Sequence, residues 1–217
     1  ALLTEPVASS SINYKNLPYL IRRHSVHSAQ SATLLLKSNQ NHLEKAQAAE
    51  LYAGFAPSYD LSDGSLPATY REGPGALVNN TQEVEHCSKV MAGKAFTGTA
   101  ASERFFKENA GSFRILHLAM HAESNDENPV LSRLIFSNET DTSEDNFLNA
   151  YEIYNMQLSA DLAVLSACNT GSGKLVRGEG VMSLANAFSY AGCPSILMSL
   201  WKANDETTAD VITHFFE

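Results

Sequence analysis

The chain has 217 residues, a formal net charge of −9, 44% hydrophobic residues and 18% charged residues. This composition suits a domain with a sizeable buried core and excludes a disordered or collagen-like chain. Because no basic patch offsets the acidic balance, a nucleic-acid partner is not expected. The first residues lack the basic and apolar regions of a signal peptide, and no apolar run approaches the roughly 18 residues of a membrane span, so we expect no membrane contact.

The first half of the chain gives few clear signals. Residues 1–49 are expected to form an N-terminal segment that packs on, or leads into, the main domain, with a strand at 17–26 and a short helix at 28–36. The apolar stretch 50–58 predicts a buried strand that ends at Pro57. The main domain is therefore expected to run from residue 50 to residue 217.

Two helices are expected after a polar stretch. Residues 80–93 place their apolar side chains on one helical face. A second helix is predicted over 100–110, with Thr99 as its N-cap and Gly111 at its end.

Three apolar runs dominate the second half of the chain, at 113–121, 161–167 and 194–201. Each is short and bounded by turn residues, which predicts strands buried on both faces. Between the last two, residues 178–192 repeat apolar side chains at helical spacing and end at Gly192, a natural C-cap.

Two further segments complete this part of the chain. Residues 148–156 predict a weaker helix that leads into the strand at 161–167, and residues 138–147 are acidic and predict an exposed loop. Strands that alternate with helices predict parallel pairing, so the expected fold class is α/β, a layered α/β/α sandwich with a mostly parallel central sheet.

The three cysteines, Cys87, Cys168 and Cys193, are odd in number and widely spaced. This argues against a disulfide framework and predicts a reducing compartment, the cytoplasm. Since no C-x-x-C pair occurs, a structural zinc site is not expected.

Cys168 comes at the end of the predicted buried strand at 161–167, and His121 is the last residue of the one predicted at 113–121. The carboxyl ends of parallel strands form the active-site edge of such a sheet, so both side chains are expected there. A histidine can take the proton of a cysteine nucleophile and later give it to a leaving amine. Taken singly, each residue also agrees with a structural role: Cys168 with that of a small core side chain, and His121 with that of a capping or solvent-facing side chain.

Other chemistries fit the same residues poorly. The stretch TGSGKL lacks two of the residues that a phosphate-binding loop requires. His117 and His121 are four residues apart, but without the intervening glutamate, and on a strand they would lie about 13 Å apart. No G-x-S-x-G elbow occurs. A nucleotide-binding loop, a zinc peptidase and the commonest kind of serine hydrolase are therefore not expected.

Four motifs stand out, in this order along the chain: GFAPSY, HLAMHAESNDENPVLSRLIFS, LSACNTGSG and RGEGVMSLANAFSYAGCPSILMSLWKAND. Together they resemble the CHAT domain, a caspase- and separase-like family often joined to tetratricopeptide repeats in bacteria. The resemblance covers roughly residues 50–217 and, more weakly, 17–37. It implies a caspase-like fold, a dyad of His121 and Cys168, and a domain that continues a few tens of residues past Glu217. Family members usually carry Glu after the cysteine, where this chain has Asn169.

The resemblance implies a cysteine endopeptidase that acts through a thioester, has a protein as its substrate and requires no metal and no organic cofactor. The backbone N–H groups of Ala122 and Cys168 are expected to hold the oxyanion. The stretch 199–205, which contains Ser199, Trp201 and Asp205, is expected to bind substrate, because it is similar to the separase stretch whose aspartate faces an arginine side chain.

Two questions stay open from the sequence. The position of Asp205 agrees with a residue that lines a pocket for Arg or Lys, and equally well with the N-cap of a final helix. The domain also fits a catalytically silent scaffold that acts beside repeats or a regulatory partner outside this chain, although the intact Cys168 and His121 favour a peptidase.

Overall fold

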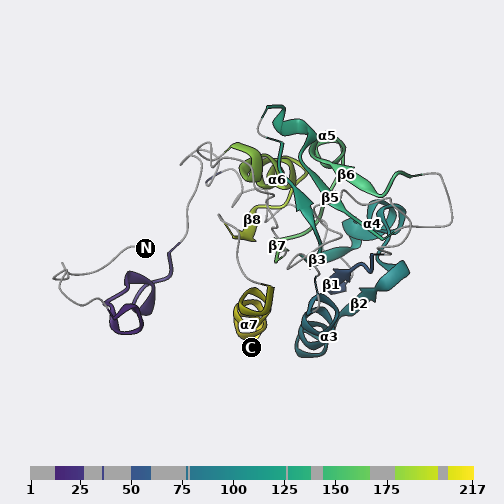
Figure 1. The fold of residues 1–217 in the computed structure, drawn as a ribbon. Coiled ribbons are helices and arrows are strands. Elements are labelled where there is room, and N and C mark those ends of the chain that lie inside the picture. The colour runs from purple at the N-terminus through teal and green to yellow at the C-terminus, as the bar shows by residue number, and fades with distance from the viewer. Residues whose placement is uncertain are drawn as a thin grey trace. The chain divides into compact units, whose positions relative to one another are not determined.

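The structure, a computed structural model, describes residues 13–26, 36, 50–59, 77, 79–125, 127–137, 144–166, 179–199 and 205–217. The chain divides into two compact units, Ala1–Leu43 and Glu44–Glu217. The second unit holds the α/β domain (Figure 1). In the part of the chain that the structure describes, no helix has the length and apolar character needed to cross a membrane.

The first unit contains two single-turn 3₁₀ helices, η1 (Tyr14–Asn16) and η2 (Leu20–Arg22). The strand predicted at 17–26 is therefore wrong. The backbone N–H groups of Arg23 and His24 both bond to the carbonyl of Leu20, so this segment forms local turns. The helix predicted at 28–36 lies outside the described residues except for its last position.

The second unit is built on a sheet of five parallel strands in the order β2-β1-β3-β7-β8. The strands are β1 (Glu50–Ala56), β2 (Lys94–Thr97), β3 (Phe113–Leu118), β7 (Leu162–Leu165) and β8 (Ser195–Met198). The four apolar runs predicted as strands are confirmed, and the α/β fold with its mostly parallel sheet is compatible with a caspase-like fold. The edge strand β2 was not predicted, because it is short and only partly buried.

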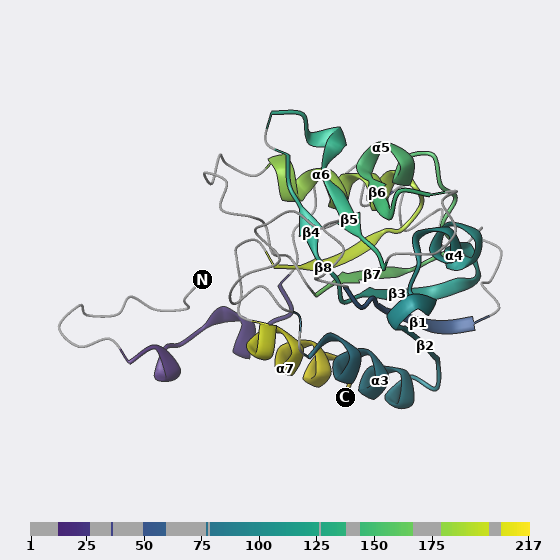
Figure 2. The same cartoon turned by 45° about the vertical axis from the view of Figure 1, so that its right-hand side comes forward.

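Helices cover both faces of this sheet, which gives three layers (Figures 1 and 2). On one face lie α3 (Asn80–Val90) and α7 (Asp205–Phe216), which contact each other. On the other face lie α4 (Glu103–Asn109) and α6 (Glu179–Tyr190), with the larger core between them and the sheet. The helices predicted at 80–93, 100–110 and 178–192 are confirmed.

A second, antiparallel sheet covers part of the same face as α6. It has the order β4-β5-β6, with β4 (Ala122–Glu123), β5 (Arg133–Ile135) and β6 (Phe147–Asn149). The weak helix predicted at 148–156 is shorter than expected, since its first residues belong to β6 and only α5 (Ala150–Ile153) is helical. Most of the loop predicted at 138–147 lies outside the described residues.

Helix ends follow local side-chain chemistry. The N-cap of α4 is Ser102, whose hydroxyl accepts a hydrogen bond from the N–H of Phe105, so the prediction of Thr99 is wrong. Thr99 lies instead in a 3₁₀ turn, η3 (Gly98–Ala100). Gly192 ends α6 as predicted: its φ is 115°, and the next N–H, of Cys193, bonds back to the carbonyl of Phe188.

The layer of α3 and α7 is fixed to the sheet by a buried polar chain. The hydroxyl of Tyr52 lies 2.7 Å from Nδ1 of His117, and Nε2 of His117 lies 2.7 Å from a carboxylate oxygen of Glu83 on α3. The ring of Phe216, at the end of α7, packs against both Tyr52 and His117. All three polar side chains are buried, so each relies on the others for its hydrogen bonds.

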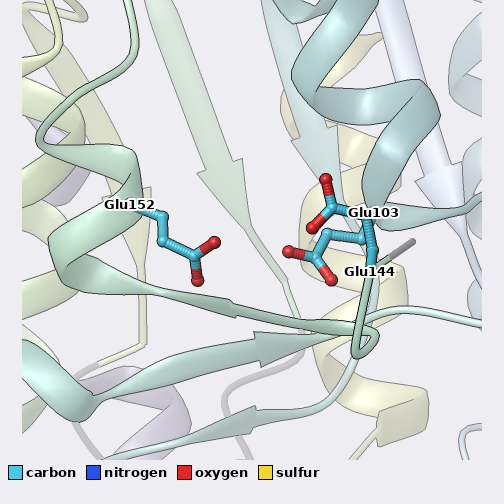
Figure 3. A group of neighbouring side chains, drawn as sticks. All are labelled: Glu103, Glu144 and Glu152. Atoms are coloured by element: carbon cyan, nitrogen blue, oxygen red, sulfur yellow. The ribbon is translucent and has the colours of Figure 1, made fainter. Parts of the chain in front are cut away.

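The opposite layer contains a half-buried ion cluster around Lys107, in which Glu103 is the fully buried member. Nζ of Lys107 on α4 lies 2.7 Å from Glu103, 2.8 Å from Glu144 and 2.7 Å from Glu152. Figure 3 shows the three glutamates converging from α4, from the segment before β6 and from α5. Burial raises the pKa of Glu103, which is 1% exposed, despite the nearby ammonium. The pKa of Glu152 is lowered. Burial acts to raise this pKa, but the hydrogen bonds from Lys107 and Asn149 outweigh the effect of burial.

We expect Lys107→Met to lower the free energy of unfolding by about 3 kcal/mol, because it leaves the buried carboxylate of Glu103 and two half-buried carboxylates without their cation. The exposed pair of Lys94 and Glu50 has the same 2.7 Å separation and serves as control, so Lys94→Met should cost less than about 1 kcal/mol. Urea denaturation measures both. Equal losses in the two variants would contradict the role of the cluster.

Candidate active site

His121 lies at the carboxyl edge of the central sheet. β3 ends at Leu118, and His121 follows three residues later, immediately before β4. Its side chain is 2% exposed. Burial lowers the pKa of its imidazole to about 4, so His121 is neutral at physiological pH.

Cys168 and Trp201 lie outside the described residues, but the strand that leads to Cys168 is described. β7 pairs with β3 in parallel, and Leu165 lies opposite Leu118. The N–H of Ser166 continues this pairing, with a bond of 3.2 Å to the carbonyl of Leu118. In sequence, Cys168 follows Leu165 by three residues, as His121 follows Leu118. Two in-register strands therefore lead to the two residues of the predicted dyad.

Ala122 begins β4 and lies opposite Leu134 of β5. The N–H of Ile135 bonds to the carbonyl of His121, so the pair of Ala122 and Leu134 is a non-hydrogen-bonded pair of the antiparallel ladder. In such a pair the backbone N–H points away from the partner strand. The N–H of Ala122 therefore faces the outer edge of β4, which is the edge strand of this sheet among the described residues.

Ser199 comes directly after β8, whose last residue, Met198, lies opposite Leu165. Its Oγ is buried and has no hydrogen-bond partner among the residues that the structure describes. Ser199 therefore lies at the same edge of the sheet as Ser166, on the strand next to β7.

Asp205 is the first residue of α7. Its Oδ2 accepts hydrogen bonds from the backbone N–H of Asn79, at 3.2 Å, and from the Asn79 side chain, at 3.1 Å. Asp205 therefore joins the start of α7 to the start of α3. A carboxylate offers about four acceptor positions, so these two bonds leave capacity for a further donor.

Two asparagines at the start of α3 were missed by the sequence analysis. Nδ2 of Asn80 donates to the carbonyls of Pro57, at 3.1 Å, and Ala119, at 3.3 Å. These carbonyls follow β1 and β3, so Asn80 ties α3 to the chain two residues before His121. Such bonds to backbone leave little signal in one sequence, because a polar residue at a helix start is common.

The other two cysteines are poor candidates for chemistry. Cys87 and Cys193 are both buried, and burial raises the pKa of the Cys87 thiol to about 12. The thiol of Cys193 donates to the carbonyl of Ser195. Since the thiolate is the reactive form, neither residue is expected to act as a nucleophile.

Among the described residues, the three glutamates around Lys107 have the spacing of metal ligands, since one oxygen from each lies within 4.8 Å of the others. The ammonium of Lys107 lies within 2.8 Å of all three, in the place that a cation would take. We assign this cluster to stability.

A comparison with curated proteins found no match. A comparison with protein families found that the CHAT domain matches residues 2–217. This family is caspase-like and related to cysteine peptidases, in agreement with the layered fold and with the resemblance of the sequence motifs. The chain belongs to the CHAT domain family.

Proposed function

We propose that this chain is a cysteine endopeptidase with Cys168 as its nucleophile and His121 as the acid–base partner. The observation that carries the proposal is the in-register pairing of Leu118 and Leu165, each three residues before one member of the dyad. The carboxyl ends of neighbouring parallel strands are where catalytic groups meet in α/β folds. Membership of a family related to cysteine peptidases supports the same function.

The reaction begins with a neutral His121, because burial lowers the pKa of its imidazole to about 4 and leaves it unprotonated at physiological pH. It takes the proton of the Cys168 thiol as the sulfur attacks the carbonyl carbon of the substrate peptide. The resulting imidazolium is a strong acid in this buried site. It gives the proton to the leaving amine as the C–N bond breaks, and the acyl group stays on sulfur as a thioester.

Water then hydrolyses the thioester, with His121 taking its proton and returning it to the sulfur. The oxyanion of both steps is proposed to receive the N–H groups of Ala122 and Cys168. The outward direction of the Ala122 N–H supports this role, because that group is not directed at the partner strand.

The proposed substrate is a protein, cleaved after Arg or Lys. Asp205 supports this preference, because the bonds from Asn79 fix the carboxylate and leave room for a cationic side chain. Regulation by tetratricopeptide repeats or another partner outside this chain is part of the same proposal.

Cys168 should be the one thiol that reacts rapidly with a peptidyl chloromethyl ketone. Cys87 and Cys193 serve as internal controls, since both are buried. Peptide mapping by mass spectrometry locates the adduct, and Cys168→Ala should abolish peptide cleavage without changing the melting temperature. Slow labelling of all three cysteines, with no cleavage, would indicate the scaffold function instead.

Substitutions of His117, on β3, and of His121, just after it, should have different effects. His121→Ala should lower turnover by at least about a hundredfold, the usual effect of losing a positioned acid–base group. His117→Ala should lower the free energy of unfolding by about 2–3 kcal/mol, because Tyr52 and Glu83 lose their partner, and should leave turnover per folded molecule near the parent value. The reverse pattern would overturn the assignment of the dyad.

Asp205→Asn should remove the preference for Arg or Lys while Cys168 still reacts with iodoacetamide at the parent rate. The measurement is cleavage of matched peptides that differ only at the residue before the cleaved bond. Asp210→Asn is the control, since Asp210 is an exposed carboxylate on the same helix. If the parent protein cuts Leu or Met peptides as well as Arg peptides, Asp205 serves only to join α7 to α3.

A further inference from the structure

Tyr59 is the last residue of the stretch 54–59, which belongs to the family resemblance but has no role in the chemistry described above. β1 ends at Ala56, and Asn80 holds the carbonyl of Pro57 just beyond it. The chain thus brings Tyr59, from the strand next to β3, to His121.

The hydroxyl of Tyr59 is inserted into the β4–β5 ladder. By the register of this ladder, His121 lies opposite Ile135, and the N–H of Ile135 donates to the carbonyl of His121 at 2.9 Å. The second bond of such a pair would join the N–H of His121 to the carbonyl of Ile135. Here the N–H of His121 donates to Oη of Tyr59 at 3.0 Å, and Oη donates to the carbonyl of Ile135 at 2.8 Å.

The ring of Tyr59 also packs against the imidazole. The two ring centroids lie 4.7 Å apart at an interplanar angle of 37°. One side chain therefore acts on His121 twice: its hydroxyl accepts the hydrogen bond of the backbone N–H of that residue, and its ring packs against the imidazole.

We infer that Tyr59 is a positioning residue for His121, which fixes the imidazole in the orientation needed for proton transfer at Cys168. The inference rests on the proposed peptidase function. Proton transfer depends on geometry within a fraction of an ångström, so a residue that fixes the base without touching the substrate should change turnover more than substrate binding. The ring of Tyr59 also contributes to the burial that keeps the imidazole neutral.

Two substitutions separate the two contacts. Tyr59→Phe keeps the ring and removes the hydroxyl, whereas Tyr59→Leu removes both. We expect kcat to fall about tenfold in Tyr59→Phe and about a hundredfold in Tyr59→Leu, with KM within about twofold of the parent value. Tyr190→Leu is the control, since Tyr190 is 77% exposed on α6, and it should change neither constant.

A second readout does not depend on activity. NMR titration of the His121 imidazole in the complete chain should give a pKa near 4 in the parent and in Tyr59→Phe. In Tyr59→Leu we expect this pKa to rise toward the ordinary value of about 6.5, because water reaches the ring. If the parent neither cleaves peptides nor labels at Cys168, the peptidase proposal fails, while the titration still decides whether Tyr59 controls His121.

Two results would overturn the inference. One is an unchanged kcat and an unchanged titration in Tyr59→Leu. The other is a loss of activity that parallels a fall in melting temperature in both variants, while the pKa of His121 does not change. That pattern is expected of a residue with a structural role alone. Should Tyr59→Leu not fold, Tyr59→Phe decides the matter, since an unchanged kcat there would leave the hydroxyl without a role.

Discussion

The pairing of β3 with β7 is the constraint on which the rest of the site depends. These strands lie at the centre of the sheet and are in register to their last residues, with Leu118 opposite Leu165. Both strands are covered on each face, so a shift of the register by one residue would move every side chain of a strand to the opposite face of the sheet, where a different layer packs on it. The packing of the core therefore also sets where the chain leaves the sheet toward His121 and Cys168.

The layers around the sheet extend this constraint to the edge where the site lies. α3 is fixed to the sheet by the chain of Tyr52, His117 and Glu83, and its first turn holds the carbonyl of Ala119 through Asn80. Asp205 connects the start of α7 to the same turn. On the opposite face, the β4–β5 ladder and the hydroxyl of Tyr59 fix the backbone of His121. His121 is thus supported from both layers, which suits the role of acid–base group proposed for it.

The sequence was sufficient for the parts of the fold that depend on hydrophobic pattern. The runs at 113–121 and 161–167 predict buried strands because most of their residues are apolar, and the pattern does not fit an exposed element. His121 was predicted as the last residue of its strand, whereas β3 ends at Leu118, three residues earlier. The sequence could not find β2, β4 or β5, because strands of two to four residues have too few positions to show a period. Nor could it find the contact of Tyr59 with His121, since the two residues are 62 positions apart and meet only through the order of the strands.

The most direct test of this account is a crystal structure of the protein inactivated with a peptidyl chloromethyl ketone. The account predicts a covalent bond between the inhibitor and the sulfur of Cys168, with an imidazole nitrogen of His121 within about 4 Å of that sulfur. It also predicts that Tyr59 still bridges His121 and Ile135. A sulfur of Cys168 that lies beyond the reach of His121, or an adduct on another residue, would contradict the central claim that these two strand ends form a catalytic dyad.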